Sequence, residues 1–159
     1  MQDKVLTPDQ LQHKLAVWRF KGHKIVFTNG CFDLIHRGHV HYLAQARDLG
    51  DVLVVGLNTD DSVKRLGKSD SRPLQAEDTR AEVLAALHCV DAIALFDGDT
   101  PIELIQQVQP DVLVKGGDYT VETIVGHDVV AAKGGETIVL DFLPGYSTTA
   151  IENKIREAE

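Results

Sequence analysis

Residues 28–39 read Thr-Asn-Gly-Cys-Phe-Asp-Leu-Ile-His-Arg-Gly-His, and they join an apolar run to a helical pattern. The apolar run at residues 25–27 gives way to Asn-Gly, which indicates a buried strand followed by a turn. Apolar residues then recur at helical spacing and predict a helix over residues 39–49. His36 and His39 are therefore expected in the loop and first turn of a helix that follows a strand.

The start of that helix is suited to an anion. Backbone N–H groups and the positive end of the helix dipole favour a phosphate there, and two imidazoles beside it can donate hydrogen bonds to phosphoryl oxygens. A pair of histidines in a loop is often only a pair of surface residues, but their position after a strand favours the phosphate interpretation. His36 and His39 are accordingly the candidate residues for phosphate chemistry.

A metal site is another interpretation of the same residues. His41 would add a third imidazole to His36 and His39. No nearby Cys, Asp or Glu completes a site at helical spacing, and zinc needs a full set of ligands in tetrahedral geometry. We therefore expect no metal held by protein side chains here.

The composition is that of a single globular domain, with 159 residues of which 43% are hydrophobic and 25% charged. The net charge of −8 argues against nucleic acid and anionic membranes as partners, because both need a basic face, but it permits a small anionic ligand. Two cysteines without a CxxC pair are typical of reduced thiols. With no secretion signal and no apolar stretch near the roughly 20 residues of a membrane span, the chain is expected to be cytoplasmic.

Short runs rich in Val, Ile and Leu alternate with helical patterns along the chain. Because these runs show little polar alternation, we expect strands buried on both faces of a parallel sheet. Thr7-Pro8-Asp9-Gln10 and Thr100-Pro101-Ile102-Glu103 have the form of capping boxes at helix starts. The strands are expected at residues 25–28, 52–57, 92–96, 112–114 and 137–142, and the helices at residues 8–21, 39–49, 59–66, 77–87, 101–108, 127–132 and 148–157.

This alternation predicts an α/β fold, a single doubly wound (Rossmann-like) domain with a five-stranded parallel sheet. The domain is expected to span residues 1–159, with residues 1–22 as an N-terminal helical extension and residues 24–155 as the core. In such sheets ligands bind beyond the carboxyl ends of the strands, so segments at those ends are candidates for a binding site.

Lys115-Gly116-Gly117-Asp118 ends the fourth predicted strand. A tight turn alone would justify both glycines. The strand-end position favours a different interpretation, in which the backbone approaches a base or sugar and Lys115 contacts a phosphate.

Gly145-Tyr146-Ser147-Thr148-Thr149 opens the final predicted helix. Simple N-capping accounts for one hydroxyl, and three exceed that need, so we expect a contact with a triphosphate. For Lys68, Arg72 and Arg80 two interpretations stay open, a solvated face or cations that close over the phosphates.

In their order, these segments resemble the cytidylyltransferase-like family of nucleotidyltransferases, whose mark is a His-x-Gly-His motif after the first strand. The resemblance spans residues 24–155 and includes Thr-Asn-Gly-Cys-Phe-Asp, His-Arg-Gly-His, Asn-Thr-Asp and Arg-Pro-Leu. Within the family, Val-Lys-Gly-Gly-Asp-Tyr and Tyr-Ser-Thr-Thr-Ala-Ile are most similar to segments of the adenylyltransferases that act on D-glycero-β-D-manno-heptose 1-phosphate. Those enzymes are standalone or form the carboxyl-terminal half of a bifunctional enzyme, and without a kinase half here the standalone kind is expected.

The resemblance implies that ATP and heptose 1-phosphate give ADP-heptose and pyrophosphate, with Mg²⁺, for lipopolysaccharide or surface-glycan synthesis. ATP and a sugar 1-phosphate would then be the partners. A homodimer is expected, with apolar residues of segments 77–87 or 92–96 as its candidate face. Two alternatives stay open, a glycerol-3-phosphate cytidylyltransferase-type enzyme and a non-catalytic sensor that binds a nucleotide.

The family's functional residues carry over onto the matching positions of this chain. His36 and His39 would stabilise the transition state at the α-phosphorus, and Lys68 corresponds to a catalytic lysine of a mobile loop. Arg80 corresponds to an arginine that faces the phosphates, and the three hydroxyl residues of the last segment would hold the β- and γ-phosphates. The implied nucleotide-binding set is Asn29, Gly30, Cys31, Phe32, Arg80, Lys115, Gly116, Gly117, Asp118, Tyr146, Ser147, Thr148 and Thr149.

Two positions depart from the pattern of glycerol-3-phosphate cytidylyltransferases. Gly117 stands where those enzymes carry Asp, which suits adenine better than cytosine. Phe142 and Leu143 stand where they carry Arg-Thr, so one expected phosphate cation is missing. Lys115 is our hypothesis for its replacement.

Overall fold

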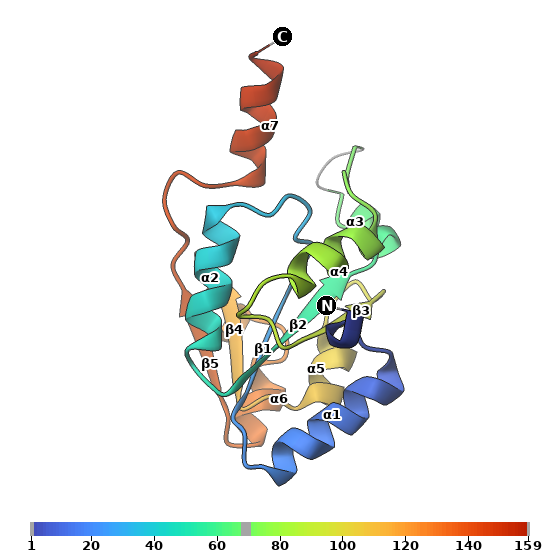
Figure 1. The fold of residues 1–159 in the computed structure, drawn as a ribbon. Coiled ribbons are helices and arrows are strands. Elements are labelled where there is room, and N and C mark those ends of the chain that lie inside the picture. Colours follow the sequence, from blue (N-terminus) through green and yellow to red (C-terminus); the bar gives the residue numbers. More distant parts are fainter. Residues whose placement is uncertain (1, 68–70, 159) are drawn as a thin grey trace.

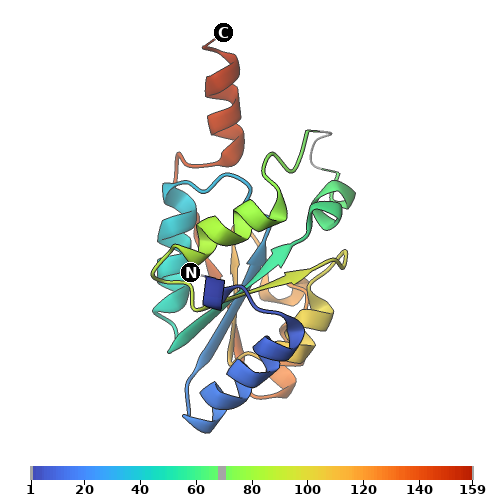
Figure 2. The same ribbon diagram turned by 45° about the vertical axis from the view of Figure 1, so that its right-hand side comes forward.

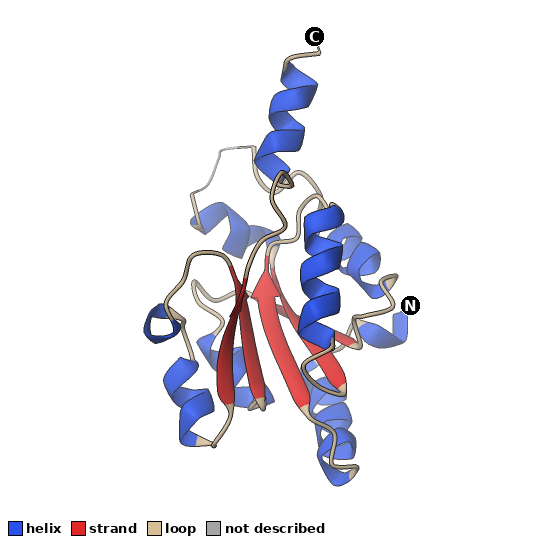
Figure 3. Cartoon of the chain, turned by 90° about the vertical axis from the view of Figure 1, so that its left-hand side faces the viewer, coloured by secondary structure: helices blue, strands red, loops and turns tan. Residues whose placement is uncertain are grey.

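The computed structural model describes residues 2–67 and 71–158, so the predicted catalytic residue Lys68 lies outside the described residues. Its centre is a five-stranded sheet in the order β3-β2-β1-β4-β5, with every neighbouring pair parallel. The predicted doubly wound α/β fold is confirmed (Figure 1, Figure 3). The strands are β1 (Ile25–Gly30), β2 (Val52–Asn58), β3 (Ala92–Phe96), β4 (Val112–Gly116) and β5 (Glu136–Leu140).

Each face of the sheet has its own apolar core, because alternate strand residues point to opposite faces. Ile25 and Phe27 belong to one core, and Val26 between them belongs to the other. Strands covered on both faces can be continuous runs of Val, Ile and Leu, as the sequence predicts. The first core is covered by α1 (Pro8–Phe20), α5 (Ile102–Val108) and α6 (His127–Ala132), and the second by α2 (Arg37–Arg47) and α4 (Glu77–Ala85).

One helix stands apart from these layers. α7 (Thr148–Arg156) lies beyond the carboxyl ends of the strands and away from the rest of the molecule (Figure 1, Figure 2), and none of its residues is buried. No described helix is long and apolar enough to cross a membrane. The remaining elements are α3 (Asp60–Arg65) and the short 3-10 helices η1 (Gln2–Lys4) and η2 (Val121–Thr123).

The residues before α1 lie along the outer edge of β3. Val5 forms an isolated parallel bridge with Ile93, and the N–H of Leu6 donates to the carbonyl oxygen of Ile93 at 2.9 Å. Leu6, Leu11 and Leu15 then join the core on one face of the sheet. The N-terminal segment is therefore part of the folded domain.

The capping box predicted for the first helix is confirmed, whereas the second is wrong. The hydroxyl of Thr7 accepts from the N–H of Gln10, and the side chain of Gln10 accepts from the N–H of Thr7. At α5 the N-cap residue is Pro101, and no side-chain hydrogen bond caps the helix. Because this helix begins one residue later than the motif requires, Thr100 stands too early to cap it.

The predicted strand and helix ends differ from the observed ones by a few residues, and the differences are informative at the carboxyl edge. β1 and β4 run past their predicted ends to Gly30 and Gly116. Backbone pairing continues there, with Gly30 beside Leu57 and Gly116 beside Leu140. α2 begins before the predicted residue 39, because His36 supplies its N-cap.

The strand order locates the crevice of the fold. β1 lies in the middle of the sheet, between β2 and β4, and the order of the strands reverses at that point. In parallel sheets such a point leaves a crevice at the carboxyl ends of the two central strands. α2 follows β1 directly at this edge, and the segment that leads to α7 follows β5.

Candidate functional site

His36 caps the helix that the sequence predicts to bind phosphate. It is the N-cap residue of α2, with an extended backbone at φ −133° and ψ 172°. Its Nδ1 accepts a hydrogen bond from the backbone N–H of His39 at 3.4 Å. A neutral imidazole carries one proton, so an accepting Nδ1 leaves that proton on Nε2. His36 can therefore cap the helix and still donate from Nε2.

The ring of His39 stacks on the ring of His36. The two centroids are 3.9 Å apart and the planes are inclined by 21°. Phe32 packs edge-on against His39, with centroids 5.4 Å apart. Gly38 permits this arrangement, because a Cβ there would lie 3.0 Å from the His36 ring and 3.1 Å from the Cβ of Tyr146. Packing thus explains the glycine between the two histidines.

Burial lowers the pKa of both imidazoles. For His39, burial and then the neighbouring His36 ring lower the pKa from 6.5 to about 4. For His36, burial again lowers the pKa from its ordinary value. Both rings are therefore neutral at pH 7 in the free protein, and they can act as hydrogen-bond donors but not as full charges.

A cavity of about 500 Å³ opens beside the two histidines. Two regions distant in sequence face each other across it. We call residues 36–42 the histidine wall and residues 142–156 the helix wall. The predicted site residues that the structure brings together at this cavity are His36, His39, Tyr146, Ser147, Thr148 and Thr149.

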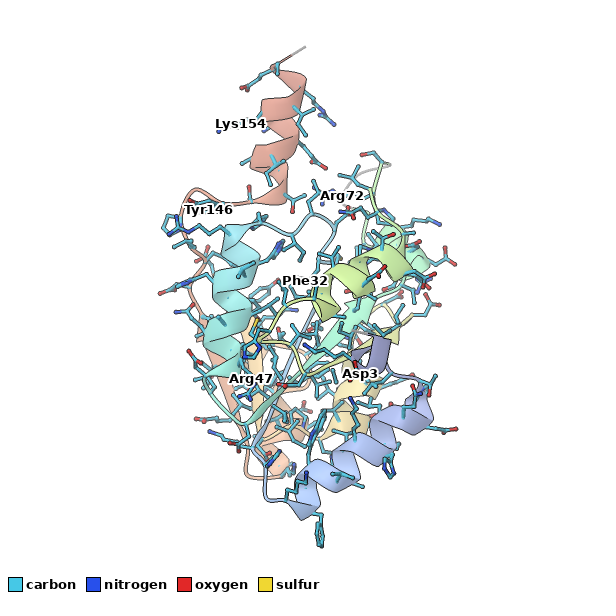
Figure 4. All side chains as sticks on the ribbon, in the orientation of Figure 1. Asp3, Phe32, Arg47, Arg72, Tyr146 and Lys154 are labelled. Atoms are coloured by element: carbon cyan, nitrogen blue, oxygen red, sulfur yellow. The ribbon has the colours of Figure 1, made fainter. Side chains whose placement is uncertain are left out.

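Contacts at the start of α7 join the two walls. The Oγ of Ser147 caps α7 by accepting from the N–H of Ala150 at 3.0 Å, so capping uses one hydroxyl as predicted. The Nη1 of Arg37 in the histidine wall donates to the hydroxyl of Tyr146 at 3.0 Å. The Cζ atom of the same guanidinium lies 5.4 Å from the centroid of the Tyr146 ring. Figure 4 shows Tyr146 and Arg72 on opposite sides of the first turn of α7.

A second group of predicted residues meets at the ends of β1 and β4. The Nζ of Lys115 donates to the Oδ1 of Asn29 at 3.1 Å. Phe142 packs over the two glycines, because a Cβ at Gly116 or Gly117 would lie 2.6 or 2.7 Å from its ring. Gly117 also has φ +110°, which disfavours any side chain. Phe142 lines the cavity as well, so this group borders the first, and its contact with a nucleotide stays a prediction.

The turn after β1 contains a strained residue. Phe32 is buried and has a φ of 46°, in the left-handed region that residues with side chains rarely adopt. Its ring packs on Gly30, where a Cβ would lie 3.0 Å away. Strained positions of this kind concentrate at functional sites. Cys31 lies between them, and its Sγ contacts the Oδ1 of Asn58 at 3.9 Å.

Arg80 supports that turn from inside the protein. Its guanidinium donates to the carbonyl of Cys31 at 2.7 Å, to the Oδ1 of Asp60 at 2.7 Å and to the carbonyl of Gln75 at 3.0 Å. The side chain is fully buried, so the interpretation of Arg80 as part of a solvated face is wrong. The structure turns this guanidinium toward protein groups, and its contact with a phosphate stays a prediction.

Two carboxylates contact Arg72, a residue of the cavity lining, and neither is among the site residues predicted from the sequence. Asp33 is buried and accepts hydrogen bonds from the N–H groups of Leu74 and Gln75 at 2.8 to 3.0 Å. Its one sequence signal is an acid within the apolar stretch Cys-Phe-Asp-Leu-Ile. Glu152 of α7 forms an ion pair with Arg72 at 2.9 Å, and the Arg72 side chain is only 14% exposed. Arg72 is therefore not on a solvated face either.

The described residues offer no metal centre of their own. Among residues 2–67 and 71–158, no group of three or more His, Cys, Asp and Glu side chains could hold a metal ion. Asp118 is exposed just past β4, and Glu152 is the carboxylate in the described lining of the cavity.

Comparison with known proteins identifies the family. The family described as cytidylyltransferase-like matches residues 27–154. The bifunctional protein HldE of Rhodopseudomonas palustris (strain HaA2) is 55% identical over 157 residues, which cover 98% of this chain and 32% of that protein. HldE of Citrifermentans bemidjiense is 55% identical over 152 residues, covering 96% of this chain and 31% of that protein. The chain thus spans about a third of the length of these curated relatives.

Solved structures agree with the fold. A lipopolysaccharide core biosynthesis protein from Thermoplasma volcanium GSS1 superposes with a TM-score of 0.62 at 26% identity, covering 77% of this chain and 98% of that one. A pantoate-beta-alanine ligase from Francisella tularensis gives a TM-score of 0.61 at 18% identity, covering 96% and 77%, and shows the fold alone. The chain belongs to the cytidylyltransferase-like family.

Proposed function

We propose that the chain transfers AMP from ATP to D-glycero-β-D-manno-heptose 1-phosphate, giving ADP-heptose and pyrophosphate. The observation that carries this proposal is the stacked pair of imidazoles at the start of α2, beside a cavity edged by three hydroxyl residues. Membership of the cytidylyltransferase-like family and 55% identity to HldE support nucleotidyl transfer. The Val-Lys-Gly-Gly-Asp-Tyr and Tyr-Ser-Thr-Thr-Ala-Ile segments support the heptose acceptor. Similarity to the lipopolysaccharide core biosynthesis protein of Thermoplasma volcanium supports a role in lipopolysaccharide synthesis.

The proposed chemistry is an in-line displacement at phosphorus. An oxygen of the sugar phosphate attacks the α-phosphorus of ATP, and the bond from that phosphorus to the α,β-bridging oxygen breaks. Pyrophosphate leaves with the electron pair of the broken bond. The attacking oxygen is already ionised at neutral pH, so no general base is needed, and catalysis rests on positioning and on stabilisation of charge.

The histidine wall would supply that stabilisation. The Nε2–H of His36 can donate to an oxygen of the α-phosphoryl group, since its Nδ1 is engaged in capping the helix. His39 is held beside it by the ring stack and by Phe32. Donors fixed before the reaction need no reorganisation as negative charge develops, which is the most effective form of electrostatic catalysis.

The helix wall would hold the rest of the polyphosphate. Thr148 and Thr149 line the cavity at the N-terminus of α7. Their side chains carry oxygen atoms, which are the ligands that Mg²⁺ prefers. A Mg²⁺ that arrives on the nucleotide fits such a site, because this ion keeps several waters and takes most of its other ligands from substrate phosphates. When bound, Mg²⁺ would neutralise charge on the departing pyrophosphate.

The test is the release of pyrophosphate with a matrix of substrates. Heptose 1-phosphate, other sugar 1-phosphates and glycerol 3-phosphate are each combined with ATP, CTP and GTP. We expect the highest kcat/KM for heptose 1-phosphate with ATP. A preference for glycerol 3-phosphate with CTP would replace this proposal by the cytidylyltransferase reaction, and tight binding of ATP without pyrophosphate release from any pair would indicate a sensor.

We also propose that the chain forms a homodimer through segments 77–87 or 92–96. The exposed apolar residue Val83 on α4 supports a contact there. Analytical ultracentrifugation of the wild type and of Val83→Glu would test this: a shift from dimer to monomer in the variant is expected, and a monomeric wild type would refute it.

A further inference from the structure

Arg72 connects three separate parts of the chain at the edge of the cavity. Its Nη2 lies 2.9 Å from the Oε1 of Glu152 on α7, and its Nη1 lies 3.6 Å from the Oδ2 of Asp33. The guanidinium is largely shielded from solvent, with 14% of the side chain exposed. Arg72 also lines the same cavity as His36 and His39.

The two carboxylates differ in how firmly they are held. Asp33 has 1% of its side chain exposed, and its oxygens already accept from the N–H groups of Leu74 and Gln75. It is thus a fixed part of the turn beneath the site. Glu152 is carried by α7, which buries none of its residues. Of the two partners, only Glu152 can be displaced without disturbing the core.

Arg72 is one of two cations in the described lining of the cavity, and it is the one held against two carboxylates. The lining contains Arg72 and Arg156 as positive groups and Glu152 as a negative one, and the two imidazoles are neutral at pH 7. A polyphosphate needs positive partners, and the guanidinium is well matched to phosphate because it donates two parallel hydrogen bonds. The carboxylate of Glu152 now occupies one of those donors and would repel an incoming phosphate.

We propose that Arg72 is a phosphate-positioning residue and that Glu152 holds the place of a phosphate group on it in the free protein. When a nucleotide binds, an oxygen of its polyphosphate replaces the carboxylate of Glu152 on Nη2, while Asp33 keeps its place. The first turns of α7 are released from Arg72 in the same step. This inference rests on the proposed function, because it takes the polyphosphate to be that of the nucleotide.

The test measures binding rather than turnover. Isothermal titration calorimetry with ATP and with inorganic tripolyphosphate is carried out on the wild type, Glu152→Gln, Arg72→Gln, Arg72→Lys and the double variant Arg72→Gln/Glu152→Gln. Glu157→Gln is the matched control, because it removes the same charge at the exposed end of the same helix. Thermal melting of every variant establishes that it is folded.

We expect Glu152→Gln to tighten tripolyphosphate binding by about fivefold or more relative to Glu157→Gln, a typical size for coupling between two ligands of one group. Arg72→Gln should weaken binding by about 10- to 100-fold, as for the loss of a charge-assisted hydrogen bond, and Arg72→Lys should recover part of it. In the double variant, Glu152→Gln should no longer tighten tripolyphosphate binding, because the carboxylate of Glu152 and the phosphate compete for the guanidinium of Arg72.

Binding by Glu152→Gln that equals or falls below that of Glu157→Gln would overturn the inference. The pair would then be an ordinary ion pair that fastens α7 to the domain. This result is distinguishable from failure of the proposed function, which would appear as a wild type that binds ATP but releases no pyrophosphate. A wild type that binds neither ATP nor tripolyphosphate would refute both.

Discussion

The two walls of the cavity are built in opposite ways. The histidine wall belongs to a helix that buries Gly38, Tyr42, Leu43 and Ala46 against the sheet. The helix wall ends in α7, which buries none of its residues and is attached through polar contacts of Tyr146 and Glu152. The atoms proposed to act on the reacting phosphorus are thus placed by the core, and those proposed to hold the polyphosphate are placed by polar contacts outside it.

The two walls are therefore suited to different functions. Groups that stabilise a transition state must be held within a fraction of an ångström, which packed elements achieve better than exposed ones. Groups that admit and release a ligand benefit from elements of low local stability. Changes in the histidine wall should therefore alter turnover and global stability, whereas changes in the helix wall should alter binding and local order.

The sharpest test of this division is loss of either imidazole. His36→Ala and His39→Ala should each lower kcat by about 100- to 1000-fold, the usual effect of removing one preorganised donor. His41→Ala, an exposed position on the same helix, should retain kcat. Steady-state pyrophosphate release provides the measurement, and circular dichroism checks the fold. Near-wild-type kcat in both variants would remove the histidine wall from the mechanism.

The next test compares one tyrosine from each wall. The hydroxyl of Tyr42 is buried and contacts the Oγ of Thr28 at 2.6 Å and the carbonyl of Val114 at 3.2 Å. Tyr42→Phe removes both buried hydrogen bonds and should lower the free energy of unfolding by about 1–3 kcal/mol. Tyr146→Phe loses one exposed hydrogen bond to Arg37 and should change it by no more than about 0.5 kcal/mol. Urea denaturation would measure both, and equal losses would contradict the comparison.

The decrease of the unfolding free energy at acid pH should depend on His39 of the histidine wall. The pKa of His39 is about 4 in the folded protein and ordinarily 6.5. Between pH 6.5 and 4, His39 therefore binds a proton in the unfolded chain but stays unprotonated in the folded protein. The contribution of His39 to the unfolding free energy is thus fully present above pH 6.5 and is lost as the pH falls toward 4. His39→Gln should flatten the decline in unfolding free energy between pH 7.5 and 4.5, and the control His41→Gln should keep it. A variant curve parallel to the wild type would show that His39 titrates alike in both states.

The smallest expected effect concerns the helix wall alone. Ser147→Ala removes the hydrogen bond from the N–H of Ala150 to Oγ and should cost α7 about 1 kcal/mol of local stability. Because α7 contributes no buried residue, the global unfolding free energy should hardly change. Amide hydrogen exchange should accelerate within α7 and stay constant in α2. Acceleration in both helices would mean that the two walls unfold together.

The sheet could be predicted because its information is local. Runs of Val, Ile and Leu indicate strands buried on both faces, and both predicted ends of Ala92–Phe96 are correct. The ends of β1 and β4 could not be predicted, because Gly30 and Gly116 pair through the backbone alone and carry no apolar signal. The capping box at Thr100 failed because the motif does not encode where the helix begins relative to Pro101.

The histidine pair of the site could be predicted from the sequence, whereas the ion pairs around it could not. His36 and His39 lie on one helical turn, so their proximity follows from three residues of spacing. Arg72 meets Glu152 only because the chain brings together segments that no local pattern relates. The burial of Arg80 against Asp60 depends in the same way on how α3 and α4 pack. Short-range geometry can be read from sequence, while long-range ion pairs follow from the assembled sheet.

The bridge between Val5 and Ile93 has a consequence for the behaviour of the protein in concentrated solution. An outermost strand ordinarily presents a row of unpaired amide and carbonyl groups that can recruit a strand from another molecule. Here the N–H of Leu6 already engages the carbonyl of Ile93. The residues ahead of α1 thus occupy that border at Ile93, and trimming them should make the protein more prone to aggregate without touching the reaction centre.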